Sequence, residues 1–241
     1  MHTLSPGADL SAELVAAPLE KDSRVLAGLT ILMFVIALFC AAKWGLASAG
    51  HAFAMWHFSS WQKSNEVPDV RTWKWVHEAM YWSVKLDPDH AEYRNDMARL
   101  YEFTAVRMVE HETQVEPLLE ISLSYVRDAV RLRPSWALAW ANLSLLKYRL
   151  GRIDKEFAFA LNRAMELGAA VPAVQQIVAE TGIANWRELS VSMRKKVLQN
   201  IHGGLGSLRK REIVSIMDHY NMRAYFCRIL PLSDQKKVCK Q

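Results

Sequence analysis

The sequence predicts an all-α protein with one N-terminal transmembrane helix, a short stack of helical hairpins and a C-terminal helical cap. Three observations support this fold class. An uncharged apolar run of 18 residues lies near the N-terminus, at 25–42. From about residue 71 onward, apolar residues recur at three- and four-residue steps, the spacing of one face of a helix. Within that region, 85–101 aligns with 131–148, which indicates an internal repeat.

Composition supports a mostly helical chain with a mild charge. The chain has 241 residues, 51% of them hydrophobic, with 10 glycines and 8 prolines. That suits one helical domain with a sizeable core and smaller attachments. The net charge of +5 is far from the dense basic face of a nucleic-acid-binding protein. We therefore predict no nucleic-acid partner.

The N-terminal region predicts a membrane anchor. Residues 1–24 are short and polar, and we expect a mobile tail. Val25–Ala42 reads VLAGLTILMFVIALFCAA and carries no charge. It is about 27 Å long as a helix, close to the hydrocarbon thickness of a bilayer. Arg24 and Lys43 bracket it, and Trp44 follows at a position typical of interfacial aromatics. We predict that this run contacts membrane lipid as a single span; a buried core helix is the alternative.

A cleavable signal peptide is another alternative for the same run. The stretch LASAG places Ala47 and Ala49 in the small-x-small pattern that signal peptidase accepts. However, the apolar run is longer than the usual 7–15 residues, and Lys43 intervenes. We therefore expect residues 25–42 to remain in the mature chain.

The flanking charges predict the orientation of the span. Lys21 and Arg24 lie just before it, whereas Lys43 is the only cation for many residues after it. Cations are favoured on the cytoplasmic side. For a bacterial protein, the span would then lie in the inner membrane, with the C-terminal domain in the periplasm.

Residues 43–70 are predicted to form a juxtamembrane connector rich in aromatic side chains. Trp is favoured where one side of the ring is apolar and the other is wet, so a helix lying on the membrane surface is one interpretation. Packing against the following domain is the other. Pro68 is expected to start the next helix. The aromatic residues are Trp44, Phe53, Trp56, Phe58 and Trp61.

Residues 71–170 carry the internal repeat. Pro88 aligns with Pro134, and the second unit continues with a Trp, a Leu-small pair, a Gly turn and spaced alanines. This order resembles the tetratricopeptide repeat. The resemblance implies stacked helical hairpins that bind other proteins, with small residues that let the helices approach closely. The matching residues of the second unit are Trp140, Leu143, Ser144, Gly151, Ala160 and Ala164.

The units depart from this repeat pattern in several places. Lys147 occupies the usual tyrosine position of the second unit, and Arg94 replaces the Trp of the first. Pro88 and Pro134 are 46 positions apart rather than about 34, so about a dozen residues are inserted. We place the insertion at Val106–Pro117, where it either lengthens both helices or forms a projecting loop.

Residues 171–241 are helical but not repeat-like, and we predict that they cap the stack. Cys227 and Cys239 lie near the C-terminus, where a disulfide would suit an oxidising periplasm. Two unrelated thiols are the alternative, because cysteine spacing alone cannot establish a bond. The third cysteine, Cys40, falls in the span and is predicted to be inert.

The whole arrangement of tail, span, short repeat domain and helical tail also resembles the VpsP-type proteins of bacterial exopolysaccharide gene clusters. The matching segments are SWALAWANLSLLKYRLG, FAFALNRAMELG and NWRELS followed by VLQNI. This resemblance implies an accessory role in the assembly or export of an extracellular polysaccharide.

No residue pattern predicts a reaction. The eight histidines form neither an HExxH nor an HxxxH pair, and no CxxC occurs. The glycine-rich stretch 203–206 lacks the following Lys-Ser/Thr of a phosphate-binding loop. We therefore predict no catalytic residues, no cofactor and no metal site, and a protein that is not an enzyme.

The repeat register predicts a groove for a peptide or a partner helix. In tetratricopeptide proteins the first helix of each pair lines the concave face, and the resemblance assigns four residues from each unit to it. Ordinary surface and packing positions are the alternative. The predicted groove residues are Glu92, Asn95, Arg99 and Glu102 from the first unit, and Leu138, Ala141, Leu145 and Tyr148 from the second.

Together these features predict a membrane-anchored scaffold or regulatory subunit that binds partner proteins in exopolysaccharide assembly or export. An assembly factor or accessory subunit of another membrane complex, such as a respiratory or cytochrome-maturation system, is an alternative. An anchored enzyme is a third, and it is disfavoured because no acid/base pair, nucleophile or metal set can be nominated.

Overall fold

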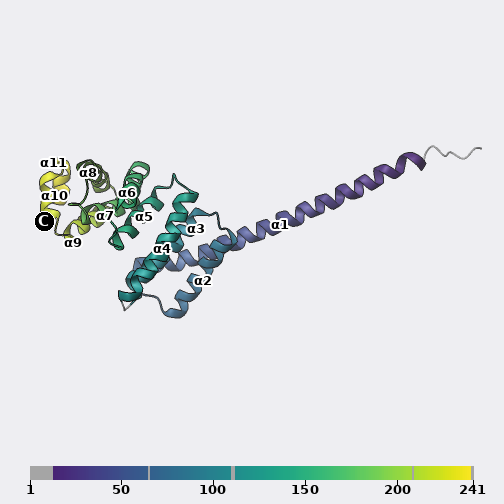
Figure 1. Ribbon diagram of the computed structural model, residues 1–241, viewed down its shortest axis with the longest axis horizontal. Coiled ribbons are helices and arrows are strands. Elements are labelled where there is room, and N and C mark those ends of the chain that lie inside the picture. Colours follow the sequence, from purple (N-terminus) through teal and green to yellow (C-terminus); the bar gives the residue numbers. More distant parts are fainter. Residues whose placement is uncertain (1–12, 65, 110–111, 208, 240–241) are drawn as a thin grey trace, which may run out of the picture.

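The predicted all-α fold is confirmed. The computed structural model describes residues 13–64, 66–109, 112–207 and 209–239, and within these ranges it contains helices and no strand. A long helix projects from a compact body in which the other helices pack together (Figure 1). The helices are α1 (Glu13–Ser64), α2 (Val70–Leu86), α3 (Ala91–Arg107), α4 (Glu112–Leu132), α5 (Ala137–Arg149), α6 (Lys155–Gly168), α7 (Pro172–Ala184), α8 (Val191–Leu205), α9 (Lys210–His219), α10 (Arg223–Ile229) and α11 (Leu232–Val238).

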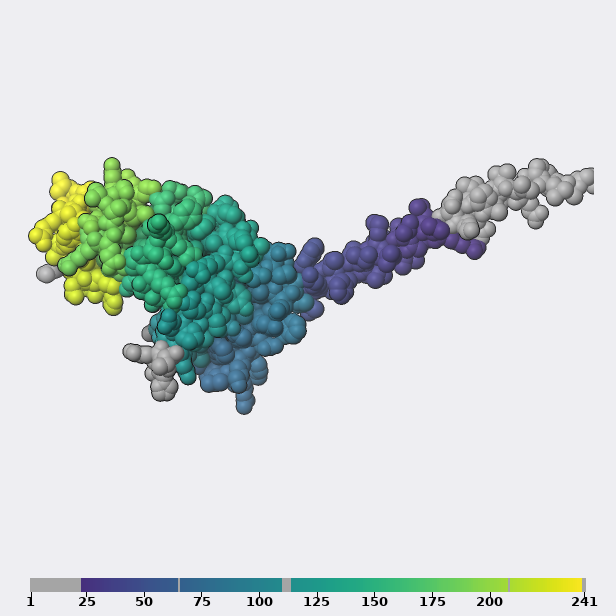
Figure 2. All heavy atoms as spheres, in the orientation of Figure 1, coloured from purple at the N-terminus to yellow at the C-terminus, as the bar shows by residue number. Residues whose placement is uncertain are grey.

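The stretch of α1 from Val25 to Phe39 is apolar and stands clear of the body (Figure 2). The large apolar side chains from Val25 to Phe39 are more than half exposed on every side of the helix. A helix that is apolar all round needs an apolar environment, and none of this stretch is buried inside the protein. This argues against a core helix, and α1 is long and apolar enough to cross a membrane.

The second half of α1 forms the first helix of the body. The helix is unbroken through most of the predicted connector, and from Ala47 onward one face packs on α2 and α3. Gly50 permits the close approach, because a Cβ there would meet Ser83 Oγ at 2.8 Å. Phe58 and Trp61 are buried in the same cluster. Of the two interpretations of the connector, the structure shows packing against the domain.

The body is a stack of antiparallel helix pairs. The second half of α1 pairs with α2, α3 with α4, α5 with α6, and α7 with α8. The second half of α1 is the partner of α2, so these two helices form a complete pair upstream of Pro88. The insertion in the first unit lengthens both helices, since α3 has 17 residues and α4 has 21.

Local chemistry explains where several helices begin and end. Asp69, Asp154 and Ser190 each accept a hydrogen bond from a backbone N–H in the first turn of α2, α6 and α8, which satisfies groups that have no partner within the helix. Gly151 closes the turn after α5 with a φ of 65°, a conformation that favours glycine.

Small residues of α5 let its neighbours approach closely, as expected from the sequence. Ala139, Ala141 and Ser144 are completely buried, and α5 packs on α4, α6 and α7 at once. Leu143 and Leu146 fill the space between α5 and its neighbours in the middle apolar cluster.

At the position where the repeat pattern has tyrosine, this chain has Lys147, which forms ion pairs with two carboxylates. Lys147 has only 3% of its side chain exposed, and its Nζ lies 2.5 Å from Asp154 and 3.1 Å from Glu156. Arg127 donates two hydrogen bonds, of 2.8 and 2.6 Å, to the same Glu156. The hydrogen bond from Lys147 lowers the pKa of Asp154, and that from Arg127 lowers the pKa of Glu156. These contacts join α4, α5 and α6.

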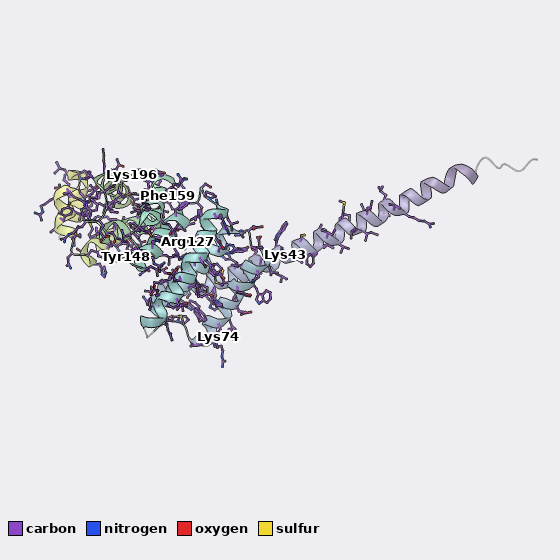
Figure 3. The ribbon with its side chains drawn as sticks, in the orientation of Figure 1. Lys43, Lys74, Arg127, Tyr148, Phe159 and Lys196 are labelled. Carbon is purple, nitrogen blue, oxygen red and sulfur yellow. A yellow bond between two sulfur atoms is a disulfide. The ribbon has the colours of Figure 1, made fainter. Side chains whose placement is uncertain are left out.

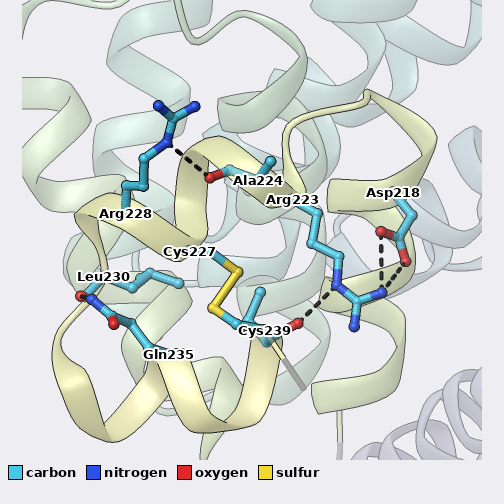
Figure 4. Close-up of a disulfide and its surroundings, with 9 residues drawn as sticks. Asp218, Arg223, Ala224, Cys227, Arg228, Leu230, Gln235 and Cys239 are labelled. Carbon is cyan, nitrogen blue, oxygen red and sulfur yellow. Dashed lines mark hydrogen bonds and ion pairs between the residues drawn. A yellow bond between two sulfur atoms is a disulfide. The ribbon is translucent and has the colours of Figure 1, made fainter. Parts of the chain in front are cut away.

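The C-terminal cap is shorter than the predicted 171–241, because α7 and α8 pack as a further helix pair of the stack and only α9, α10 and α11 follow it. A disulfide joins Cys227 of α10 to Cys239 at the end of α11, with 5.7 Å between their Cα atoms (Figure 4). The buried carboxylate of Asp234 contacts His202 Nδ1 of α8 at 2.5 Å and Lys237 Nζ at 3.0 Å. Burial alone would raise the pKa of Asp234, but these hydrogen bonds lower it. The cap is thus fastened both internally and to α8.

We expect the disulfide to be measurable by thiol labelling. The denatured chain should react with maleimide only at Cys40 without reductant, and at all three cysteines after reduction. A bridge over a loop of this size stabilises by about 3 kcal/mol, so the pair Cys227→Ser and Cys239→Ser should lower the melting temperature. Cys40→Ser is the control and should leave it unchanged. Full labelling without reductant would contradict the bond.

Candidate partner-binding cleft

A cleft of about 570 Å³ lies where the first helices of successive pairs come together. The second half of α1 contributes Trp61 and Gln62, and α7 contributes Gln176 and Ile177. Arg209, just before α9, completes the far end. These positions span more than half of the chain, so the cleft exists only in the assembled stack.

The middle of the cleft is lined by α3 and α5. On α5 the lining residues are four, three and four positions apart, which places them on a single helical face: Leu138, Asn142, Leu145 and Arg149. The lining residues of α3 are Arg99, Glu102, Phe103, Val106 and Arg107. The surface therefore combines apolar side chains with charges of both signs.

Four of the eight predicted groove residues line this cleft. Arg99 and Glu102 do so from α3, and Leu138 and Leu145 from α5. The first helix of each pair faces the cleft, which is the geometry that the tetratricopeptide resemblance implies.

The other four predicted residues lie elsewhere. Glu92 is exposed at the start of α3 but is not part of the cleft. Asn95 is completely buried and accepts a 2.8 Å hydrogen bond from Asn142. Ala141 is completely buried in the core. Tyr148 packs on the C-terminal apolar cluster, with its hydroxyl 2.8 Å from that of Tyr220.

On α5 the prediction is right at Leu138 and Leu145 and wrong by one residue at the other two positions. Asn142 and Arg149 occupy the positions that we assigned to Ala141 and Tyr148. One residue turns a helix by about 100°, which is enough to move a side chain from the cleft into the core.

Arg149 lies between two carboxylates of neighbouring helices. Its Nε is 2.6 Å from Glu102 Oε1, and its Nη2 is 3.9 Å from Glu180 Oε1. Burial raises the pKa of Glu180; Arg149 opposes that change and Glu102 adds to it. This shared guanidinium joins α3, α5 and α7 across the cleft.

Arg99 is held in place at the other wall. Its Nη1 donates to Asp96 Oδ1 at 2.9 Å, and its Nη2 donates to Gln62 Oε1 at 3.2 Å. The guanidinium also lies over the ring of Phe58, 5.3 Å from its centre. His51 of α1 contacts the other oxygen of Asp96 at 2.9 Å. The wall is therefore preorganised, with its charges already positioned before anything binds.

Known proteins provide no assignment for this cleft. The chain matches no family model and no curated protein. Among the residues that the structure describes, no group of three or more His, Cys, Asp or Glu side chains could hold a metal ion. The tetratricopeptide and VpsP-type resemblances stay predictions from the sequence, and the function has to be argued from the geometry of the cleft.

Proposed function

We propose that the protein is a membrane-anchored scaffold that binds a segment of a partner protein in the cleft. The observation that carries the proposal is one continuous cleft lined by α1, α3, α5 and α7 together. Leu138, Leu145 and Ile177 supply apolar contacts for a bound segment, while the fixed charges around Arg99 and Arg149 can select its polar groups. Extended and helical peptides are commonly bound in grooves of this composition.

We further propose that the anchor lies in a bacterial inner membrane and the body in the periplasm. The cations before the span favour that orientation, and a disulfide between Cys227 and Cys239 suits an oxidising compartment. On the VpsP-type resemblance, we propose that the partner belongs to an exopolysaccharide assembly or export system.

Photo-crosslinking in native membranes tests the cleft. A benzophenone amino acid at Gln176 or Val106, both in the cleft, should yield adducts with the same partner. The matched position is Phe159, which is 56% exposed on α6 and outside the cleft (Figure 3). It should yield no adduct with that partner. Equal adducts at all three positions would contradict the assignment, and the partner's identity would show whether the complex makes polysaccharide.

A pair of matched valine variants provides a second measurement. Val106 is 46% exposed in the cleft, and Val191 is 81% exposed on α8. Because both side chains reach solvent, Val106→Glu and Val191→Glu should each change the free energy of unfolding by less than about 0.5 kcal/mol. Only Val106→Glu should reduce co-purification of the crosslinked partner. Equal retention of the partner by both variants would argue against binding in the cleft.

A further inference from the structure

A second surface lies outside the cleft, on the helix pair nearest the anchor. Four large aromatic side chains are exposed there, two from α1 and two from α2. Single exposed apolar residues are normal, but a cluster of this kind indicates an interaction site. We call this surface the α1/α2 outer face; its members are Phe53 (43% exposed), Trp56 (69%), Trp75 (59%) and Trp82 (53%).

These aromatic residues point away from the rest of the stack. α1 contacts α3 through Phe58, and α2 does so through Trp73. At 100° per residue, Trp56 lies about 160° around α1 from Phe58. Trp75 and Trp82 lie about 160° and 180° around α2 from Trp73. The surface is therefore the outer side of the first helix pair.

No helix in the part of the chain that the structure describes covers this end of the stack. In stacked repeats each pair covers the face of its neighbour, and a terminal pair normally presents a polar outer side. At the opposite end α9, α10 and α11 close the stack (Figure 1). The α1/α2 outer face instead carries four exposed aromatic side chains among its polar residues, which is the character of a face that another helix covers.

Trp56 and Trp75 lie beyond the expected reach of the bilayer, whereas Trp82, next to Ser83 and therefore level with Gly50, lies about 9 Å past Trp44 at the edge of the polar zone. Trp56 follows Trp44 by 12 residues in the unbroken α1, or about 18 Å. The polar zone beyond the hydrocarbon is only about 5–8 Å thick on each side, and membrane helices tilt by about 20° on average. α2 runs antiparallel with Ser83 opposite Gly50, so Trp75 lies about 12 Å farther from the membrane than Ser83.

The charges around the aromatic residues are mainly positive. Arg71 and Lys85 are within one turn of Trp75 and Trp82, Lys63 lies two turns beyond Trp56, and Lys74 adjoins Trp75. Lys63, Arg71 and Lys74 make no ion pair with the residues that the structure describes. Within α2 the one carboxylate is Glu78, which accepts a 2.8 Å hydrogen bond from the Trp82 indole. Glu66 and Asp69 lie before α2, where Asp69 caps the helix, and Asp87 follows it. A second copy of this surface would add the same charges and be repelled, whereas an acidic partner is attracted.

We propose that the α1/α2 outer face binds an amphipathic helix of a second protein in the same membrane. The apolar side of that helix covers the four aromatic residues, and its acidic residues face Lys63, Arg71, Lys74 and Lys85. The bound helix supplies the missing cap of the stack. This surface is distinct from the cleft, so the inference does not depend on what the cleft binds.

The test is photo-crosslinking from Trp75 in the full-length chain in native membranes. Benzophenone at this position should form a protein adduct. Mass spectrometry should show that the crosslinked peptide has apolar residues at three- and four-residue steps and acidic residues between them. The variant Arg71→Glu with Lys74→Glu should lose the adduct, since it reverses two exposed charges (Lys74 is labelled in Figure 3).

The matched control is Lys195→Glu with Lys210→Glu, which reverses two exposed charges on α8 and α9 and should retain the adduct. Both double variants should melt like the parent when followed by tryptophan fluorescence, which separates loss of this surface from loss of the fold. The proposal is overturned by an adduct with phospholipid, by an adduct with α1 or α2 of another copy, by an adduct that survives charge reversal, or by no adduct.

Discussion

Replacing Leu161 with aspartate is expected to unfold the body of the protein. Leu161 is completely buried in the largest apolar cluster. The nearest residues one turn away on α6 include Phe157, Ala164 and Met165, so no cation on that helix can pair with the new carboxylate. An uncompensated buried charge costs several kcal/mol at least, against a total stability of about 5–15 kcal/mol for a folded domain.

Two variants on the same helix calibrate this expectation. Phe159 is 56% exposed and its ring meets that of Trp140 edge-on, so Phe159→Asp should cost only about 0.5–1.5 kcal/mol. Leu161→Ala should lower the free energy of unfolding by about 2–5 kcal/mol. The measurement is tryptophan fluorescence and limited proteolysis of the detergent-solubilised full-length chain, because circular dichroism would also report α1. A cooperative parental melt for Leu161→Asp would show that this cluster is not the core.

The sequence predicted those parts of the fold that depend on local pattern. An uncharged run with flanking cations indicates a span at any point in a chain. The buried small residues Ala139 and Ser144 of α5 were recognisable because small residues at helical spacing indicate close helices. Pro88 and Pro134 marked the pair boundaries for a similar local reason, since proline disfavours continuation of a helix.

Features that depend on the assembled stack could not be predicted in this way. The join between the span and the first helix of the body contains Gly45 and Gly50, either of which could end a helix, so the continuity of α1 became clear only from the structure. The groove register on α5 required the position of α7, which buries Ala141 and leaves Asn142 in the cleft. The burial of Lys147 likewise depends on Asp154 and Glu156, which follow the turn at the end of α5.

The second large expected effect concerns the ion pairs of Lys147. Removing its two carboxylate partners should cost more stability than removing the lysine itself. Asp154→Asn with Glu156→Gln would leave an ammonium group that is only 3% exposed without a carboxylate. Breaking a buried pair in this way costs about 3–5 kcal/mol. Asparagine can still cap α6, so the loss would not come from the helix terminus.

Removing the lysine should cost less. In Lys147→Met the apolar chain still fills the space, while Asp154, which is 52% exposed, is hydrated. Glu156 keeps its two hydrogen bonds from Arg127. The triple variant, with all three substitutions, should therefore recover much of the stability that the Asp154→Asn and Glu156→Gln pair loses.

The pH dependence provides an independent check of the same ion pairs. Because Lys147 lowers the pKa of Asp154 in the folded state, its contribution is complete above the ordinary carboxylate pKa of about 4 and is lost as the pH falls below it. The parent should therefore lose more stability than Lys147→Met between neutral pH and about pH 3. Chemical denaturation of the parent, Lys147→Met, the carboxylate double variant and the triple variant, followed by tryptophan fluorescence, measures both the loss of stability and its pH dependence. If Lys147→Met is as unstable as the carboxylate double variant, the instability of the double variant does not come from leaving the buried ammonium group unpaired.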